Sequence, residues 1–108
     1  MLNADEYNRR DAVGLAALVA AGEVTASEVV EMGMARIEAT DRPVNGVVAT
    51  CFDDAHRDIG ARLPVGPLAG VPYLVKDLNT WVRGMPATNG SRALAEFVPD
   101  RDAVLIER

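Results

Sequence analysis

The feature that most constrains the fold is a short apolar run that ends abruptly on a charge. Residues 71–75, VPYLV, follow a turn punctuated by glycine and proline, and Lys76 and Asp77 come directly after them. An apolar run of this length, bounded by turn residues, is typical of a strand buried in a sheet. Such a strand needs neighbours along its edges and cover on its faces, so it predicts a layered fold.

The residues before this run predict helices that would supply the cover. Asp11 has the position of a cap for a helix over residues 12–21, which Gly22 would end. Thr25 and Glu28 have the spacing of a capping box that opens a second helix. The apolar positions of that second helix recur at helical spacing and predict a core-facing stripe; they are Val30, Gly33, Met34 and Ile37.

Two further segments continue the alternation of helix and strand. Residues 46–52, GVVATCF, are apolar and rich in β-branched side chains, so they predict a second buried strand that contains Cys51. Residues 53–63 predict a third amphipathic helix, closed by Pro64. Its Asp53 and Asp54 would favour the helix dipole, and His56 would be solvated or lie at the boundary.

The last residues predict that the sequence is the front part of a longer one. Pro99 and Asp100 resemble a helix start, and residues 103–106 begin an apolar face that stops at Arg108. We therefore expect residues 1–108 to be the N-terminal part of a single domain, with residues 1–10 as a flexible or helical lead-in. The predicted class is α/β, with a mixed sheet flanked by helices.

Composition excludes several classes of function. The chain has 108 residues and a net charge of −5, without a basic stripe, which argues against nucleic acid and anionic membranes as partners. The single cysteine excludes an internal disulfide and a multi-cysteine zinc site, and no ligand cluster or phosphate-binding glycine loop calls for a cofactor. The polar N-terminus and the lack of a long apolar run predict a cytoplasmic protein.

Lys76 has two interpretations from the residues alone. A lysine at the end of a buried strand loses hydration, its pKa falls, and it becomes a competent general base. In the alternative, the stem of Lys76 lies over the sheet edge while its head stays in water or pairs with an acid such as Asp77. Trp81 and Met85 in the following loop likewise either line a substrate pocket or cover the sheet edge.

The segment "GPLAGVPYLVKDLN" with the later "GMPATNGS" resembles the N-terminal block of the amidase signature family. The resemblance extends from about Asp11 to the end, including the "GEVTASEVVEMGMARIEATD" helix, Asn45 and "DRDAVLIER". The positions that match the family pattern are Gly66, Pro67, Leu68, Gly70, Val71, Pro72, Lys76, Asp77, Gly84, Gly90 and Ser91.

The resemblance implies a chemistry for Lys76. Family members hydrolyse or transfer carboxamides with a serine nucleophile, a second serine in a cis peptide bond, and a lysine, and Lys76 matches that lysine. The two serines lie in a Gly/Ser-rich segment downstream, which does not occur before Arg108. Ser91 matches the loop after the lysine and is no candidate nucleophile. Residues 1–108 alone are therefore expected to be inactive, and the acyl pocket and substrate stay unidentified.

Within the family, "AGVPYLVKDL" is more similar to hydrolases of the nylon-oligomer type than to the tRNA-dependent amidotransferase subunit. That subunit usually continues Lys-Asp-Asn and has a Thr-Thr pair, whereas here Leu78 follows Asp77 and Ala87-Thr88 replaces the pair. The expected partner is a small-molecule amide, with a homo-oligomer or the missing C-terminal part as further possibilities. The rival hypothesis is a truncated, non-catalytic remnant or interaction module whose apolar stripes face a partner.

Overall fold

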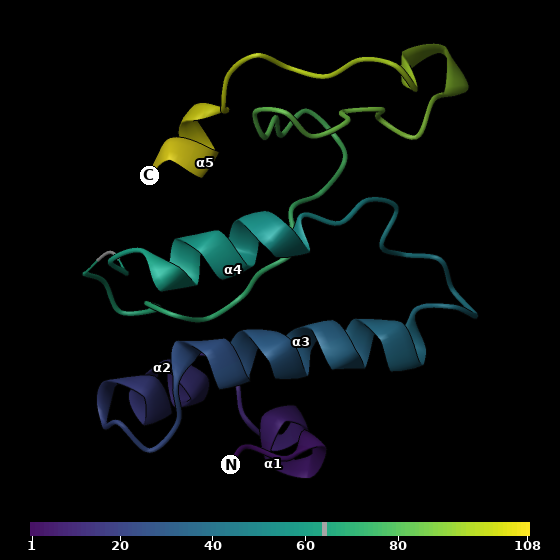
Figure 1. Ribbon diagram of the computed structural model, residues 1–108. Coiled ribbons are helices and arrows are strands. Elements are labelled where there is room, and N and C mark those ends of the chain that lie inside the picture. Colours follow the sequence, from purple (N-terminus) through teal and green to yellow (C-terminus); the bar gives the residue numbers. More distant parts are fainter. Residues whose placement is uncertain (64) are drawn as a thin grey trace. The chain divides into compact units, whose positions relative to one another are not determined.

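The computed structural model describes residues 1–63 and 65–108, and the regular elements of these residues are helical (Figure 1). The chain divides into two compact units, which we call unit 1, Met1–Pro72, and unit 2, Tyr73–Arg108. The elements are α1 (Ala4–Arg9), α2 (Ala12–Ala20), α3 (Ala26–Thr40), α4 (Phe52–Gly60), the 3-10 turn η1 (Arg92–Leu94) and α5 (Val104–Glu107).

Side-chain caps set the starts of the first three helices, as the sequence predicts for α2 and α3. The Asp11 carboxylate accepts a hydrogen bond from the Gly14 amide at 2.8 Å, and Gly22 follows α2 with a left-handed φ of 71°. At α3, Thr25 and Glu28 form the expected capping box. The lead-in proves helical, because Asn3 caps α1 in a second capping box with Glu6.

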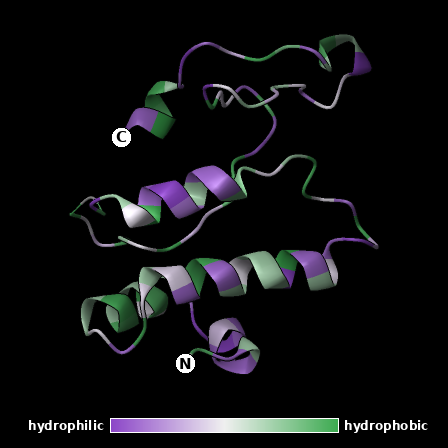
Figure 2. Cartoon of the chain, viewed as in Figure 1, coloured by the Kyte–Doolittle hydropathy of each residue, from purple (hydrophilic) through white to green (hydrophobic). Residues whose placement is uncertain are grey.

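Unit 1 has a small apolar core between its first three helices. Val29 on α3 is fully buried at 0% exposure, and it packs with four other buried side chains. α2 is apolar over most of its surface and α4 is mostly hydrophilic, as Figure 2 shows, which fits the central place of α2 in this core. The core residues are Leu2, Leu15, Leu18, Val24 and Val29, with Tyr7, Val19, Met32 and Val71 packed against them.

Two glycines let chain segments pass close to α3. A Cβ at Gly33 would come within 3.1 Å of the Tyr7 hydroxyl oxygen and 3.3 Å of Pro72 Cγ. Gly70 has a φ of +83°, and a Cβ there would lie 2.9 Å from the Cβ of Ala26. The motif segment that leads to Lys76 is therefore packed directly on α3 up to Pro72. Position 70 requires glycine because its φ is left-handed and because a Cβ there would collide with Ala26.

The predicted mixed sheet is wrong for the residues described. Neither residues 46–52 nor residues 71–75 pair with another segment as a strand. A strand forms only when a second segment supplies backbone partners, and that pairing is not a local property of the sequence. Here the Asp41 carboxylate accepts from the amides of Gly46 and Val47 at 2.8 and 3.0 Å, and Val71 donates to its own turn.

Two predicted helices are shorter than expected. The helix predicted over 53–63 is α4, which ends at Gly60 because the backbone of Ala61 is extended. Pro64, the predicted stop, lies outside the described residues. The last helix begins at Val104 rather than near Pro99, because the Pro99 carbonyl accepts a hydrogen bond from the Gly84 amide instead. None of the described helices is long and apolar enough to cross a membrane.

Cys51 is exposed, so its predicted burial in a strand is also wrong. The residue stands at the N-cap position of α4, where it makes no side-chain cap. Although the residue as a whole is exposed, partial desolvation raises the pKa of the Cys51 thiol, and the carboxylates of Asp54 and Asp58 add to the effect. Exposure therefore does not make this thiol a ready nucleophile.

Candidate functional site

Lys76 lies near the start of unit 2 and is exposed. The run before it is exposed as well, with Tyr73 at 70% and Leu74 at 69% of their full accessible area. The burial that the sequence predicts for the end of this run is thus not present among the described residues. These apolar side chains face solvent because no sheet covers them in the described part of the chain.

Lys76 is the single lysine of the chain. The sequence carries eleven lysine and arginine residues, and the other ten are arginine. Arginine supplies a permanent positive charge, but it does not give up its proton in proteins. A lysine at this one position is therefore informative, because of the lysine and arginine side chains only that of lysine can release and take up a proton during a reaction.

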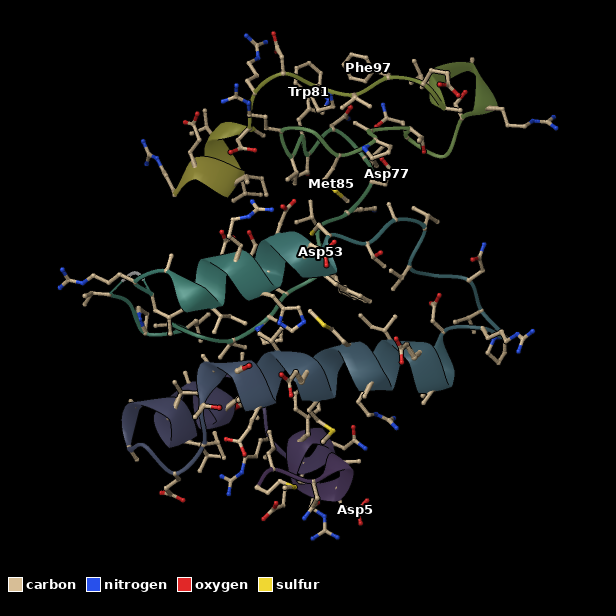
Figure 3. The ribbon with its side chains drawn as sticks, in the orientation of Figure 1. Asp5, Asp53, Asp77, Trp81, Met85 and Phe97 are labelled. Atoms are coloured by element: carbon tan, nitrogen blue, oxygen red, sulfur yellow. The ribbon has the colours of Figure 1, made fainter. Side chains whose placement is uncertain are left out.

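Asp77 joins the Lys76 segment to a loop eleven residues later. Its Oδ1 accepts hydrogen bonds from the backbone amides of Thr88 at 2.7 Å and Asn89 at 3.4 Å. Its Oδ2 accepts a hydrogen bond from the Thr88 hydroxyl, which in turn accepts from the Gly90 amide at 3.2 Å. Both carboxylate oxygens of Asp77 thus bind the 87–91 loop, and the predicted pairing of Asp77 with Lys76 is absent among the described residues (Figure 3).

Two asparagines tie the same loops together from the other side. The Asn79 amide donates to Oδ1 of Asn89 at 3.0 Å, and Nδ2 of Asn89 reaches Oδ1 of Asn79 at 3.5 Å. Both residues have left-handed backbones, with φ values of 56° and 50°. Asparagine tolerates this conformation better than most residues, which explains its use at both turns. We call the contacts among Asp77, Asn79, Thr88 and Asn89 the clasp.

The clasp favours the ionised form of Asp77. Hydrogen bonds from the Thr88 side chain, and then from the backbone amides of Thr88, Asn89 and Gly90, lower the pKa of Asp77 below its ordinary value of 3.8, against the opposing effect of desolvation. A carboxylate held by several donors stays charged at neutral pH. The clasp therefore has its full set of charge-assisted hydrogen bonds under ordinary conditions.

Trp81 belongs to the packing of unit 2. Its ring meets that of Phe97 edge to face, with centroids 5.6 Å apart, and the Arg101 guanidinium lies 5.5 Å from the centre of the Trp81 ring. Figure 3 shows Trp81 and Phe97 together in this unit. Met85 is half-buried. These contacts place Trp81 in the local packing of unit 2, and the described residues form no sheet whose edge it could cover.

Backbone hydrogen bonds join residues 81–87 of unit 2 to residues 97–103. The amide of Ala87 donates to the Phe97 carbonyl, and that of Gly84 donates to the Pro99 carbonyl, both at 3.0 Å. Farther along, the Ala103 amide donates to the Trp81 carbonyl at 2.8 Å. The loop that carries Thr88 and Asn89 is therefore fixed at its base as well as by the clasp.

Four other polar residues of interest in the sequence lie outside the clasp. Ser91 caps η1 by accepting a hydrogen bond from the Ala93 amide at 3.3 Å. Asp53 and Asp54 lie in the first turn of α4, and His56 is exposed. In the described part of the chain, no group of three or more His, Cys, Asp or Glu residues is arranged to hold a metal ion.

The sequence motif contains Lys76 and Asp77, but it does not predict the contacts of the clasp. Thr88 and Asn89 occur in it only as loop residues. Their contacts with Asp77 could not be predicted, because hydrogen bonds over a separation of eleven residues leave no periodic pattern in the sequence. The available signal is the pair of asparagines, each at a turn and one followed by Gly90.

Comparison with known proteins gives one family for most of the chain. Residues 28–108 match the family described as Amidase. A glutamyl-tRNA(Gln) amidotransferase subunit of Acidothermus cellulolyticus is 43% identical over 107 residues, covering 93% of this chain and 21% of that protein. The same subunit of Salinispora tropica is 41% identical over 104 residues, covering 90% and 21%.

A relative of a different type is similar over the same region. The 6-aminohexanoate-cyclic-dimer hydrolase of Pseudomonas sp. is 35% identical over 101 residues, covering 92% of this chain and 20% of that protein. The chain thus spans about a fifth of the length of these curated relatives. Since the family match covers Lys76, the clasp and most other residues, the chain belongs to the amidase family.

Proposed function

We propose that the chain is the N-terminal part of an amide hydrolase that cleaves carboxamide bonds by a Ser–cis-Ser–Lys mechanism, with Lys76 as its lysine. The observation that carries the proposal is that the single lysine of the chain stands inside the matched family region, at the motif position. The substrate class is a small-molecule amide, and the two serines would come from the rest of the protein.

In this mechanism Lys76 moves a proton in each half of the reaction. The hydroxyl of the nucleophilic serine attacks the amide carbon, its proton passes to the bridging serine, and the proton of the bridging serine passes to the unprotonated amine of Lys76. Cleavage of the C–N bond then releases the amine of the substrate, which receives a proton from Lys76 through the bridging serine. Water attacks the resulting acyl-serine by the same route, which releases the carboxylic acid and restores the serine.

Substitution of Lys76 in the complete natural protein tests the proposal. Lys76→Ala removes the amine, and Lys76→Arg keeps a charge that cannot be given up, so both should lower kcat on a panel of linear and cyclic carboxamides by about 10³-fold or more. Arg92→Ala removes an exposed cation of the same unit and is the matched control. Hydrolysis by Lys76→Arg at the rate of the unsubstituted protein would refute the proposed role.

A second candidate is a reaction like that of the glutamyl-tRNA(Gln) amidotransferase subunit, in which the acyl group passes to an acceptor other than water. The observation in its favour is the identity of 43% to one such protein, against 35% to the cyclic-dimer hydrolase. Leu78 and the Ala87-Thr88 pair favour the hydrolase, since they depart from the residues usual in the amidotransferase. Product analysis separates the two, because a hydrolase yields the free acid without partner proteins, whereas an amidotransferase requires them together with an acceptor.

A further inference from the structure

We propose that the clasp positions Lys76 for catalysis, and that Asp77 is its central positioning residue. The inference rests on the proposed function, because it assigns a role within the same site. It concerns side chains that touch neither the substrate nor the reacting atoms in the proposed mechanism.

Asp77 is the next residue after Lys76, so its position restricts the backbone of Lys76 directly. Consecutive Cα atoms are about 3.8 Å apart, so fixing Asp77 fixes the base of the lysine side chain. Asp77 is itself fixed by Thr88 and Asn89, whose loop is held at its base by the hydrogen bond from the Ala87 amide to the Phe97 carbonyl. Ala87 is only 6% exposed, so this base is part of the packed interior of unit 2.

The same contacts engage both oxygens of Asp77, and no ion pair joins Asp77 to Lys76 in the described part of the chain. Both oxygens of Asp77 accept hydrogen bonds from the loop rather than from its neighbour in sequence. An ion pair with Asp77 would favour the charged form of the lysine, which is the wrong form for accepting a proton. The clasp therefore fixes the backbone beside Lys76, and it binds the Asp77 carboxylate to the 87–91 loop instead of to the amine of Lys76.

Four substitutions in the complete natural protein separate positioning from charge. Asp77→Ala removes every contact of the carboxylate, whereas Asp77→Asn keeps Oδ1 for the two amides and presents an NH₂ to the Thr88 hydroxyl, which can accept from it. Thr88→Val removes the hydroxyl at similar shape, and Thr88→Ser restores it. Arg92→Ala is again the control.

Active sites are counted by labelling the nucleophilic serine to completion with a fluorophosphonate. The kcat is then expressed per labelled site, at a temperature well below the unfolding midpoint. Because a displacement of about 1 Å can cost 10²-fold in rate, we expect Asp77→Ala to lower kcat by roughly that factor, with KM changed far less. Thr88→Val should show a smaller loss, and Thr88→Ser and Asp77→Asn should lie near the unsubstituted rate. A merely structural role would lower the number of labelled sites and leave the rate per site unchanged.

Several results would overturn the inference. An unchanged kcat per site in Asp77→Ala, with Lys76→Ala inactive, would refute the clasp alone and leave the proposed function standing. Activity in Lys76→Ala would refute the proposed function itself. If Asp77→Ala does not fold, the Thr88 pair decides, and equal rates for Thr88→Val and Thr88→Ser overturn the inference. Asp77→Asn as slow as Asp77→Ala would assign the effect to charge and also overturn it.

Discussion

Lys76 and Asp77 are adjacent in sequence, yet their side chains have different surroundings. The Asp77 carboxylate is surrounded by donors from a loop eleven residues away, whereas the Lys76 side chain is exposed. The motif around Lys76 can be read from the sequence alone, because it is defined by nearby glycines and prolines with strong local preferences. The partners of Asp77 cannot be predicted in this way, since they depend on how unit 2 folds back on itself.

The stability contributed by Asp77 should depend on pH in a defined direction. Its folded pKa lies below the ordinary value of 3.8, so the carboxylate stabilises the fold above that value, and the contribution is lost as the pH falls through the folded pKa. The unfolding midpoint of Asp77→Asn should therefore lie below that of the unsubstituted protein at pH 7, and the gap should begin to narrow as the pH falls below about 3.8. Thermal unfolding from pH 7 to pH 3 checks this.

Asp100→Asn is the matched control for that titration, because Asp100 is an exposed residue of the same unit. We expect its midpoint to follow that of the unsubstituted protein across the range. A gap for Asp77→Asn that stays constant down to pH 3 would contradict the assignment of ionised hydrogen-bond acceptor to Asp77.

At the scale of elements, local signals predict the helices and fail for the strands. The caps at Asp11 and Thr25 join residues only three apart, so they can be identified from spacing. The apolar segments 46–52 and 71–75 have strand-like composition, but the partners that would make them strands are not specified within them. The expected burial of Cys51 fails for the same reason, since it depends on membership of a strand.

The capping box of α3 makes a specific prediction. The Glu28 amide donates to the Thr25 hydroxyl at 3.1 Å, and Thr25→Ala removes that acceptor. Loss of such a cap costs about 1 kcal/mol, so hydrogen exchange of the Glu28 amide should become roughly fivefold faster. Thr25→Ser keeps the hydroxyl and should exchange at nearly the original rate. Equal exchange in all three proteins, measured by NMR, would show that the cap is not formed.

Gly70 offers a second test at this scale. Gly70→Ala would combine a left-handed backbone with a Cβ only 2.9 Å from that of Ala26, so it should lower the unfolding midpoint strongly. Gly22→Ala has the same kind of backbone but open space, and Gly60→Ala has neither problem. We expect the order Gly70, Gly22, Gly60 from most to least destabilising in thermal unfolding. Gly70→Ala no worse than Gly22→Ala would contradict the close packing on α3.

On the scale of the whole molecule, the chain has two compact units and a large exposed apolar area. Several large apolar side chains face solvent, among them Val65, Tyr73, Leu74 and Leu105. Exposed apolar side chains in this number favour association with other apolar surface. The chain spans about a fifth of the length of its curated relatives.

Residues 1–108 in isolation should therefore bind a hydrophobic dye, associate at micromolar concentration and hydrolyse no amide. Dye fluorescence, sedimentation and the carboxamide panel check these three outcomes. A monodisperse chain that binds no dye would favour an adapted small domain, and hydrolysis lost in Lys76→Ala would contradict the need for serines from elsewhere.

The most direct test of the central claim is chemical rescue of the missing amine. In the complete natural protein, Lys76→Ala should lose about 10³-fold or more in kcat, since members of a catalytic unit act together. Added small primary amines should restore part of the rate, in an order that follows their basicity, because a general base obeys such a relation. A Lys76→Ala protein that keeps its rate, or one that loses it and gains nothing from any amine, would contradict the assignment of Lys76 as the base.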